Sequence, residues 1–267
     1  MKKYLSFFRM KFIAGLQYRA AAYAGCTTQF VWGAMEILLF RAFFEVGEEA
    51  FPMSFEALSS YIWLQQAFLS LFMTYTMDND IFASISDGSV AYELCRPVQI
   101  YYMWFTRSMA SRLSKAILRS IPILVVAAFL PKPYRLSLPV DAIATVWFFV
   151  TLVLSFLLVV SFGMIIYIIT FYTISAYGVR IVIIGIVEFL SGDIIPIPFF
   201  PDNVRVVIEL LPFASMQNIP LRVYSGNIEG VELLGRVGIQ LFWVMIIIIM
   251  GKYMMQKALR HVVVQGG

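Results

Sequence analysis

Charged residues are scarce in this sequence of 267 residues, and histidine is almost absent. Only 13% of the residues are charged, whereas soluble domains carry about a quarter. The single histidine, His261, and the two cysteines exclude a metal site built from histidines and a disulfide framework. The sequence also has no P-loop, no Gly-x-Ser-x-Gly elbow and no apparent carboxylate pair for acid–base catalysis. These absences argue against an enzyme that acts alone, and against an ATPase in particular.

Apolar residues, by contrast, dominate the chain and make up 61% of it. Six stretches approach the length of about 20 apolar residues that crosses a hydrocarbon layer about 30 Å thick. They comprise residues 21–44, 58–77, 110–130, 142–166, 174–190 and 231–250. We therefore expect an all-α, polytopic membrane protein with about six transmembrane helices, organised as a single domain over residues 1–267.

The distribution of charge predicts how the chain is oriented. Both ends carry bases and no acids, namely Lys2, Lys3, Arg9, Lys11, Arg19, Lys252, Lys257 and Arg260. Four glutamates and no base follow the first stretch, and five acids against two bases lie between residues 193 and 232. Because cytoplasmic segments are enriched in Lys and Arg, both termini should lie in the cytoplasm and the protein in the cell (plasma) membrane. The basic residues at both ends of the chain favour contact with anionic lipid headgroups rather than with nucleic acid.

The N-terminal arm, "KKYLSFFRMKFIAGLQYR", predicts an amphipathic helix. Leu5, Phe8, Phe12 and Leu16 lie near one face with bases around them, as in helices that lie on a membrane surface. Bases interrupt what would be the apolar region of a signal peptide, so we do not expect cleavage.

A polar segment, "ISDGSVAYELCRPV" (85–98), follows the second apolar stretch. Apolar residues recur in it and just before it at helical spacing, namely Ile81, Ile85, Tyr92 and Cys95. Gly88 disfavours helix by about 1 kcal/mol relative to Ala, which predicts two short helices, the second capped by Ser89. Pro97 should end the second helix. Such a segment is either an ordinary connector or a docking element for a cytoplasmic partner.

A second interruption lies on the expected outer side, between residues 191 and 230. It contains Pro196, Pro198, Pro201, Pro212 and Pro220, too many for a spanning helix. However, "VRVVIELLPF" (204–213) is too apolar for an exposed loop. Irregular backbone at membrane depth is tolerated where it is buried in protein or lines a cavity. The segment is therefore either a re-entrant pair of short helices or an amphipathic loop on the outer leaflet.

Four bases, Arg107, Arg112, Lys115 and Arg119, mark the third apolar stretch and the residues before it. The last three fall within about 60° of one another on a helix. Arg119 lies about 16 Å from residue 130 along the axis, so it should sit below the inner surface, where an unrelieved charge costs ~2.5–3.5 kcal/mol. Snorkelling to lipid phosphates suffices for Arg107 and Arg112, whereas Arg119 should face a wet cavity or another subunit. Either interpretation fits Lys115.

Two acids also lie in apolar stretches. Glu188, in the fifth, should need an intramembrane partner such as Arg119 or Arg180, whereas Glu36, toward the outer end of the first, is expected to be interfacial and without function. The candidate pathway charges are thus Lys115, Arg119 and Glu188.

The stretch "GSVAYELCRPV" (88–98) resembles the G-S-x-A-x-x-L-x-R-P-V motif of one branch of the permease subunits of ABC-2 type ATP-binding-cassette transporters. The resemblance extends over the basic arm, the six apolar stretches and the outer segment. It implies that the polar segment is a coupling helix that contacts an ATPase, formed here by Asp87, Gly88, Ser89, Glu93, Leu94, Arg96 and Pro97. It also implies that the outer segment closes the pathway, with a gate shaped by Gly192, Pro196, Pro198, Pro201 and Pro212.

The expected function is therefore that of a permease. Two such subunits, identical or homologous, would enclose a pathway, and cytoplasmic ATPase subunits that hold ATP and Mg²⁺ would dock on the coupling helices. The resemblance implies export of an amphipathic or hydrophobic compound, with no cofactor in this chain. The alternatives are a membrane-embedded enzyme acting on lipids, which would need acids or histidines near one interface, and a channel or scaffold that works without ATP.

Overall fold

The computed structural model describes residues 2–173 and 176–260, and its secondary structure in this part of the chain is helical, without strands. The α-helices are α1 (Lys2–Leu16), α2 (Arg19–Phe44), α3 (Phe55–Ala67), α4 (Leu69–Phe72), α5 (Asn79–Ser86), α6 (Val90–Leu94), α7 (Ile100–Ala128), α8 (Ala142–Ile169), α9 (Ala176–Ser191), α10 (Asp202–Leu210), α11 (Ala214–Tyr224) and α12 (Gly230–Leu259). Three short 3₁₀ helices, η1 (Glu48–Ala50), η2 (Thr170–Tyr172) and η3 (Ile197–Phe199), join them. The expected all-α fold is confirmed.

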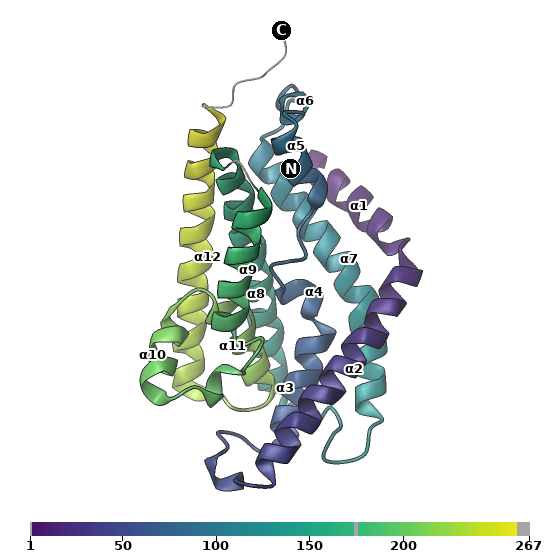
Figure 1. The fold of residues 1–267 in the computed structure, drawn as a ribbon, viewed down its shortest axis with the longest axis vertical. Coiled ribbons are helices and arrows are strands. Elements are labelled where there is room, and N and C mark those ends of the chain that lie inside the picture. The colour runs from purple at the N-terminus through teal and green to yellow at the C-terminus, as the bar shows by residue number, and fades with distance from the viewer. Residues whose placement is uncertain (1, 174–175, 261–267) are drawn as a thin grey trace.

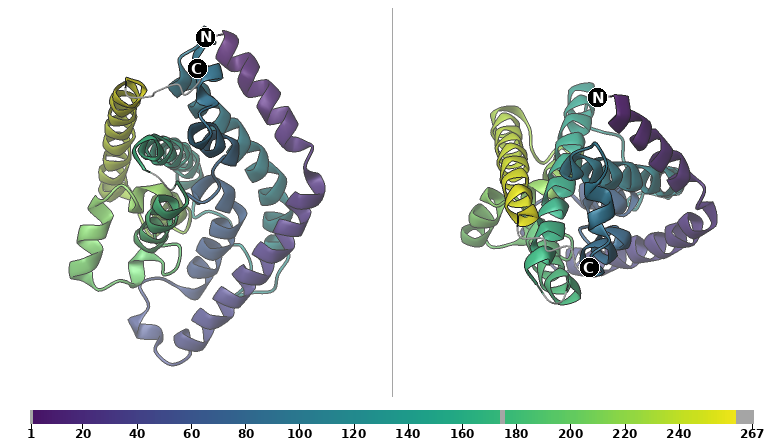
Figure 2. Two further views of the ribbon diagram at one scale, coloured as in Figure 1. Left: turned by 45° about the horizontal axis from the view of Figure 1, so that its top comes forward. Right: turned by 90° about the horizontal axis from the view of Figure 1, so that it is seen from above.

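The long helices run between two ends of the molecule (Figure 1). One end, which we call the α6 end, carries α5, α6, the start of α1 and the end of α12. The opposite end, the η1 end, carries η1 and the connections that precede α8 and α12. Figure 2 shows α1 and α2 on one flank and α10 and α12 on the other. The two basic edges of the sequence therefore lie at the same end as the polar segment, as expected from an even number of crossings.

Helices occupy all six predicted stretches, but they differ in their fitness to cross a membrane. Among the described helices, α8 continued by η2 (Ala142–Tyr172) and α12 are long and apolar enough by themselves. The 13 residues of α3 and the 16 of α9 rise about 20 and 24 Å, less than a hydrocarbon layer of about 30 Å. Helices α2 and α7 are longer but contain charged residues. The first two residues of the fifth predicted stretch, 174 and 175, lie outside the described residues.

The second predicted stretch is not one continuous helix. After α4 the chain has no helix from residue 73 to residue 78. The side chain of Arg112, buried at 3% exposure, supplies the missing donors, because its Nη1 donates to the Met73 carbonyl at 2.6 Å and to the Ser70 carbonyl at 3.4 Å. Helix ends leave carbonyls without an intrahelical donor, and this guanidinium satisfies two of them. The expectation that Arg112 reaches lipid phosphates is therefore wrong.

The expected N-terminal helix is present as α1, and it packs along α7 rather than lying free. A Cβ on Gly15 would stand 2.1 Å from the Ser114 Oγ, so the two helices cross with no room for a side chain at this position. Nearer the α6 end, Lys3 Nζ donates to the Pro97 carbonyl at 2.6 Å, and the Gln99 N–H donates to the Tyr4 hydroxyl at 3.1 Å. Helix α1 thus holds the chain between α6 and α7.

Polar bonds also tie the helices of the other flank together. The buried side chain of Gln240, on α12, donates to the Ser155 Oγ of α8 and to the Ser215 carbonyl of α11, both at 3.0 Å. In a medium without water these bonds fix the relative positions of three helices.

Candidate functional site

The segment formed by α5 and α6 projects from one end of the molecule (Figure 1). Gly88, at φ +78°, separates the two helices, as the sequence predicted. The predicted cap is wrong, however, because the Ser89 side chain makes no capping bond. Instead, the Ser89 N–H donates to Asp87 Oδ1 at 2.8 Å. This backbone bond, together with the Ser89 hydroxyl, lowers the pKa of the Asp87 carboxyl below its usual value.

Most of the predicted coupling residues lie on the surface of this projection. The exposed ones are Asp87, Gly88, Leu94, Arg96 and Pro97, and Ser89 is half-buried. Within the described residues no acceptor bonds the Arg96 guanidinium, so its charge is available to a partner. The free Cys95 is exposed here, whereas the other cysteine, Cys26, is buried.

Tyr92 is 78% exposed, although its helical spacing placed it on one face with Ile81, which is fully buried. The spacing argument assumed a continuous helix, and the turn at Gly88 redirects α6. Tyr92 therefore adds an aromatic side chain to the exposed surface, which the sequence interpretation missed.

Glu93 differs from the other coupling candidates because it bonds within the protein. Its carboxylate accepts a hydrogen bond from the indole N–H of Trp104, a fully buried residue of α7. Glu93 is half-buried as a result. It holds α6 against α7, and a partner would meet it only in part.

Arg107 anchors the base of the projection. Its guanidinium bonds both oxygens of Asp78, at 2.5 and 2.9 Å, and also Asp80 at 2.6 Å. The side chains of Arg107 and Asp78 are 13% and 18% exposed, so solvent screens this pair weakly. The Asp78 N–H donates to the Tyr167 hydroxyl of α8 at 2.7 Å. The expectation that Arg107 snorkels to phosphates is wrong, since its charge is used here.

Arg180, on α9, binds the same connection from another side. Its guanidinium donates to Asn79 Oδ1 at 2.9 Å and to the Tyr75 carbonyl at 2.7 Å, and it lies over the Phe82 ring. It is therefore not the partner of Glu188, which forms no ion pair with any described residue. The projection is thus fastened to α1, α7, α8 and α9.

A cavity of about 1140 Å³ lies between α2, α3, α4, α7 and α9. Of the candidate pathway charges, Arg119 and Glu188 line it and Lys115 does not. Glu36 also lines the cavity, and its Oε1 is buried and has no hydrogen-bond partner among the described residues. Tyr75 lines the cavity as well, and it therefore connects the Arg180 contact with this space.

The charges in the cavity are separated along α2. Glu36 and Glu188 both lie near enough to Asp193 for their charges to interact, and Gln65 Nε2 donates to Asp193 Oδ1 at 3.0 Å. Arg119 instead lies against Gly25, where an added Cβ would stand 2.8 Å from its Cζ. Gly25 and Glu36 are about 16 Å apart along the helix. The cavity is therefore basic toward the α6 end and acidic toward the η1 end.

The outer segment forms two short helices, α10 and α11, as one of the two interpretations predicted. Residues 214–223 of α11 are buried, mainly against α8, whereas α10 is largely exposed. Gly192, at φ +84°, makes the turn after α9, and a Cβ there would stand 2.8 Å from the Ile197 side chain. Three of the predicted gate prolines precede helices, Pro196 before η3, Pro201 before α10 and Pro212 before α11, and Pro198 lies within η3. Of these, only Pro201 is exposed.

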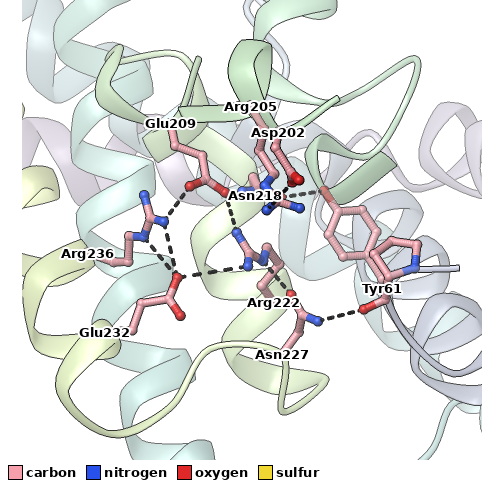
Figure 3. A network of polar contacts seen from close by, with 10 residues as sticks. Tyr61, Asp202, Arg205, Glu209, Asn218, Arg222, Asn227, Glu232 and Arg236 are labelled. Carbon is pink, nitrogen blue, oxygen red and sulfur yellow. Dashed lines mark hydrogen bonds and ion pairs between the residues drawn. The ribbon is translucent and has the colours of Figure 1, made fainter. Parts of the chain in front are cut away.

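An ion network holds these two helices to α12 (Figure 3). Glu209, on α10, is 6% exposed and bonds both Arg222 of α11, at 2.6 Å, and Arg236 of α12. Glu232 accepts from Arg236 at 3.1 Å, and Asn227 accepts from Arg222 at 2.7 Å. The sequence interpretation missed this network, although the single acid in the apolar run "VRVVIELLPF" was a signal that it needed a base.

The Glu209→Gln variant is expected to lower the melting temperature of the purified protein clearly, because two guanidinium groups would lose a buried partner. Breaking such a pair costs about 3–5 kcal/mol. The matched control is Asp202→Asn on the same helix, whose ion pair with Arg205 is largely exposed and worth about 1 kcal/mol or less. Equal shifts for the two variants, in a fluorescence-detected melt, would show that the network does not stabilise the outer helices.

Comparison with known families gives one match. The model of the family described as ABC-2 family transporter protein matches residues 30–266, from within α2 to the C-terminal tail. No curated protein matches the chain.

Proposed function

Because the chain belongs to the ABC-2 family of transporter proteins, we propose that it forms a substrate pathway and couples ATP hydrolysis by a partner ATPase to export. Membership makes it a membrane-embedded permease component of an ABC transporter, a class that works with ABC ATPase subunits. The ATPase would carry ATP and Mg²⁺, and this chain, which lacks a P-loop, would hydrolyse none itself. A second permease, identical or homologous, would complete the pathway.

The observation that carries this proposal is the projection of α5 and α6. It presents Tyr92, Leu94 and Arg96 to the outside, and an aromatic with an unpaired guanidinium is the composition typical of interface hot spots. A connector with no partner would have no need of such a surface. We propose that this surface docks into the ATPase on the cytoplasmic side, with both termini at the same face of the plasma membrane.

Motion of the projection would reach the cavity through two arginines. Arg107 fixes its base to α7, and Arg180 joins α9 to Asn79 and to the carbonyl of Tyr75, a residue that lines the cavity. A displacement of α5 would therefore move α9 and the cavity wall together. Coupling of this kind requires a packed element with two arrangements, not a flexible loop.

The outer helices α10 and α11 would serve as a re-entrant gate. Asp193 lines the cavity and directly follows the turn at Gly192, so the connection from α9 to α10 forms part of the cavity wall. The Gln65 bonds to Asp193 and the Glu209 network would have to loosen or move as a unit when the gate opens. The acidic loop at the η1 end would then face outward.

Purification of the full chain from its native membrane tests the proposal. We expect an ABC ATPase to accompany it, and ATP to drive transport in vesicles that contain both. Transport that continues without ATP would support a channel instead, and a chain that purifies without any ATPase under gentle conditions would contradict coupling.

A further inference from the structure

We propose that the acidic end of the cavity binds an organic cation with an apolar body, and that compounds of this class are the substrate. The second part rests on the proposed function, whereas the binding site does not. The acidic end is defined by Glu36, Glu188 and Asp193.

These three carboxyl groups line one cavity, and Asp193 lies near both of the others. None of them forms an ion pair with any residue that the structure describes. The acids of the outer network, by comparison, are all paired with arginines. Removing charge from water without a counter-charge is costly, so each group either holds its proton or requires a cation. A cation bound among the three groups would relieve this cost, and an anion would increase it.

A buried amide without hydrogen-bond partners also lines the cavity, about 6 Å along α2 from Gly25 and about 10 Å from Glu36. Gln29, on α2, lines the cavity at 5% exposure, and neither its Nε2 nor its Oε1 has a hydrogen-bond partner. The Oε1 of Gln65, a residue that is 1% exposed, is also unpartnered. A buried polar atom left unsatisfied costs about 1–3 kcal/mol. Two such side chains on neighbouring walls therefore indicate a ligand that offers polar atoms, or water that a ligand displaces.

The rest of the lining suits the apolar body of such a ligand. Leu38, Leu39, Leu69 and Ile194 supply aliphatic surface. Trp32 and Tyr75 supply aromatic rings, and the face of tryptophan attracts cations more strongly than the other rings do. The volume of about 1140 Å³ exceeds the range of about 300–1,000 Å³ that is usual for drug-sized ligands.

Arg119 lies beside Gly25, which is about 16 Å from Glu36 along α2, and it pairs with none of the three acids. Its Nε is buried and unpartnered. It would repel a cation at the basic end and so favour the acidic end. A zwitterion that spans both ends would instead need Arg119 for binding.

Two hydrophobic ions of the same shape and opposite charge test the proposal. Binding of labelled tetraphenylphosphonium and of tetraphenylborate is measured to the full chain in lipid nanodiscs without ATPase, with empty nanodiscs as background. We expect saturable binding of tetraphenylphosphonium, weakened about fivefold or more by Glu36→Gln or by Asp193→Asn. Glu49→Gln removes the same charge from exposed η1, outside the cavity, and should change nothing.

Three results would overturn the proposal: tighter binding of tetraphenylborate, unchanged tetraphenylphosphonium binding in the cavity variants, or loss of binding in Arg119→Gln. Because Asp193 also accepts from Gln65, its variant could unfold. Glu188→Gln removes a carboxylate whose side chain makes no bond with any described residue, so it serves as the second variant. Cation binding by a chain that co-purifies with no ABC ATPase from its native membrane would retain the site and reject the proposed function. ATP-driven transport of anions alone would support the proposed function and reject the cation site.

Discussion

Replacing Arg96 with glutamate is expected to weaken binding of the partner ATPase about 30-fold or more, corresponding to about 2 kcal/mol. Arg96 is exposed on the projection, and its guanidinium has no partner among the described residues. Reversal of its charge should therefore disturb docking without disturbing the permease. Binding is measured by titration of the ATPase onto the purified permease, and an unchanged melting temperature of the permease confirms that the fold is intact.

The control for this variant is Arg135→Glu, which reverses an exposed base between α7 and α8, at the η1 end. It should leave ATPase binding unchanged, whereas Tyr92→Ala, on the projection itself, should weaken it. Equal binding by the Arg96 and Arg135 variants would contradict docking on α6. Variants of Glu93 are less suitable for this purpose, because they also break the bond to Trp104.

Replacing Arg107 with glutamine is expected to separate hydrolysis from transport. The ATPase should still bind and hydrolyse ATP, while transport falls at least about tenfold, because loss of a partner from a buried pair costs about 3 kcal/mol at this junction. The chain has no helix between residues 73 and 78, so the bonds of Arg107 to Asp78 and Asp80 fix α5 relative to α7. Hydrolysis and transport are measured in the same vesicles.

Arg107→Lys provides the graded control, since it keeps the charge but loses the bidentate geometry. It should retain part of the transport. If ATPase binding and transport disappear together in Arg107→Gln, the residue acts in docking or folding and not in coupling.

The sequence predicted the positions of the helices well, because long apolar runs mark segments that are buried in lipid or in the protein core. It did not reveal the break after α4, because residues 73–77 belong to the apolar second stretch. The donor that stabilises the break, Arg112, lies 39 residues beyond the Met73 carbonyl that it bonds. Hydropathy averages over neighbours in the chain, whereas the satisfaction of a free carbonyl depends on a neighbour in space.

The functional residues show the same difference between features that depend on neighbours in the chain and features that depend on neighbours in space. The split at Gly88 follows from the local properties of glycine and was predicted correctly. The exposure of Tyr92 depends on the direction that α6 takes after that turn, and the helical spacing did not predict this direction. Glu36 seemed unremarkable in sequence because the groups that line the cavity with it, from α3, α9 and the segment after α9, are distant in the chain. Features set by a single residue can thus be predicted from the sequence, whereas contacts between helices that are distant in the chain cannot.

The contrast between the two cysteines gives this permease a built-in reporter. Cys26 is shielded, and Cys95 stands at the end of α6, next to Arg96. A maleimide dye should therefore label one position of the unaltered protein, Cys95, at the surface where the ATPase would dock. Its fluorescence would follow each docking event in real time, with no engineered residue to complicate the kinetics.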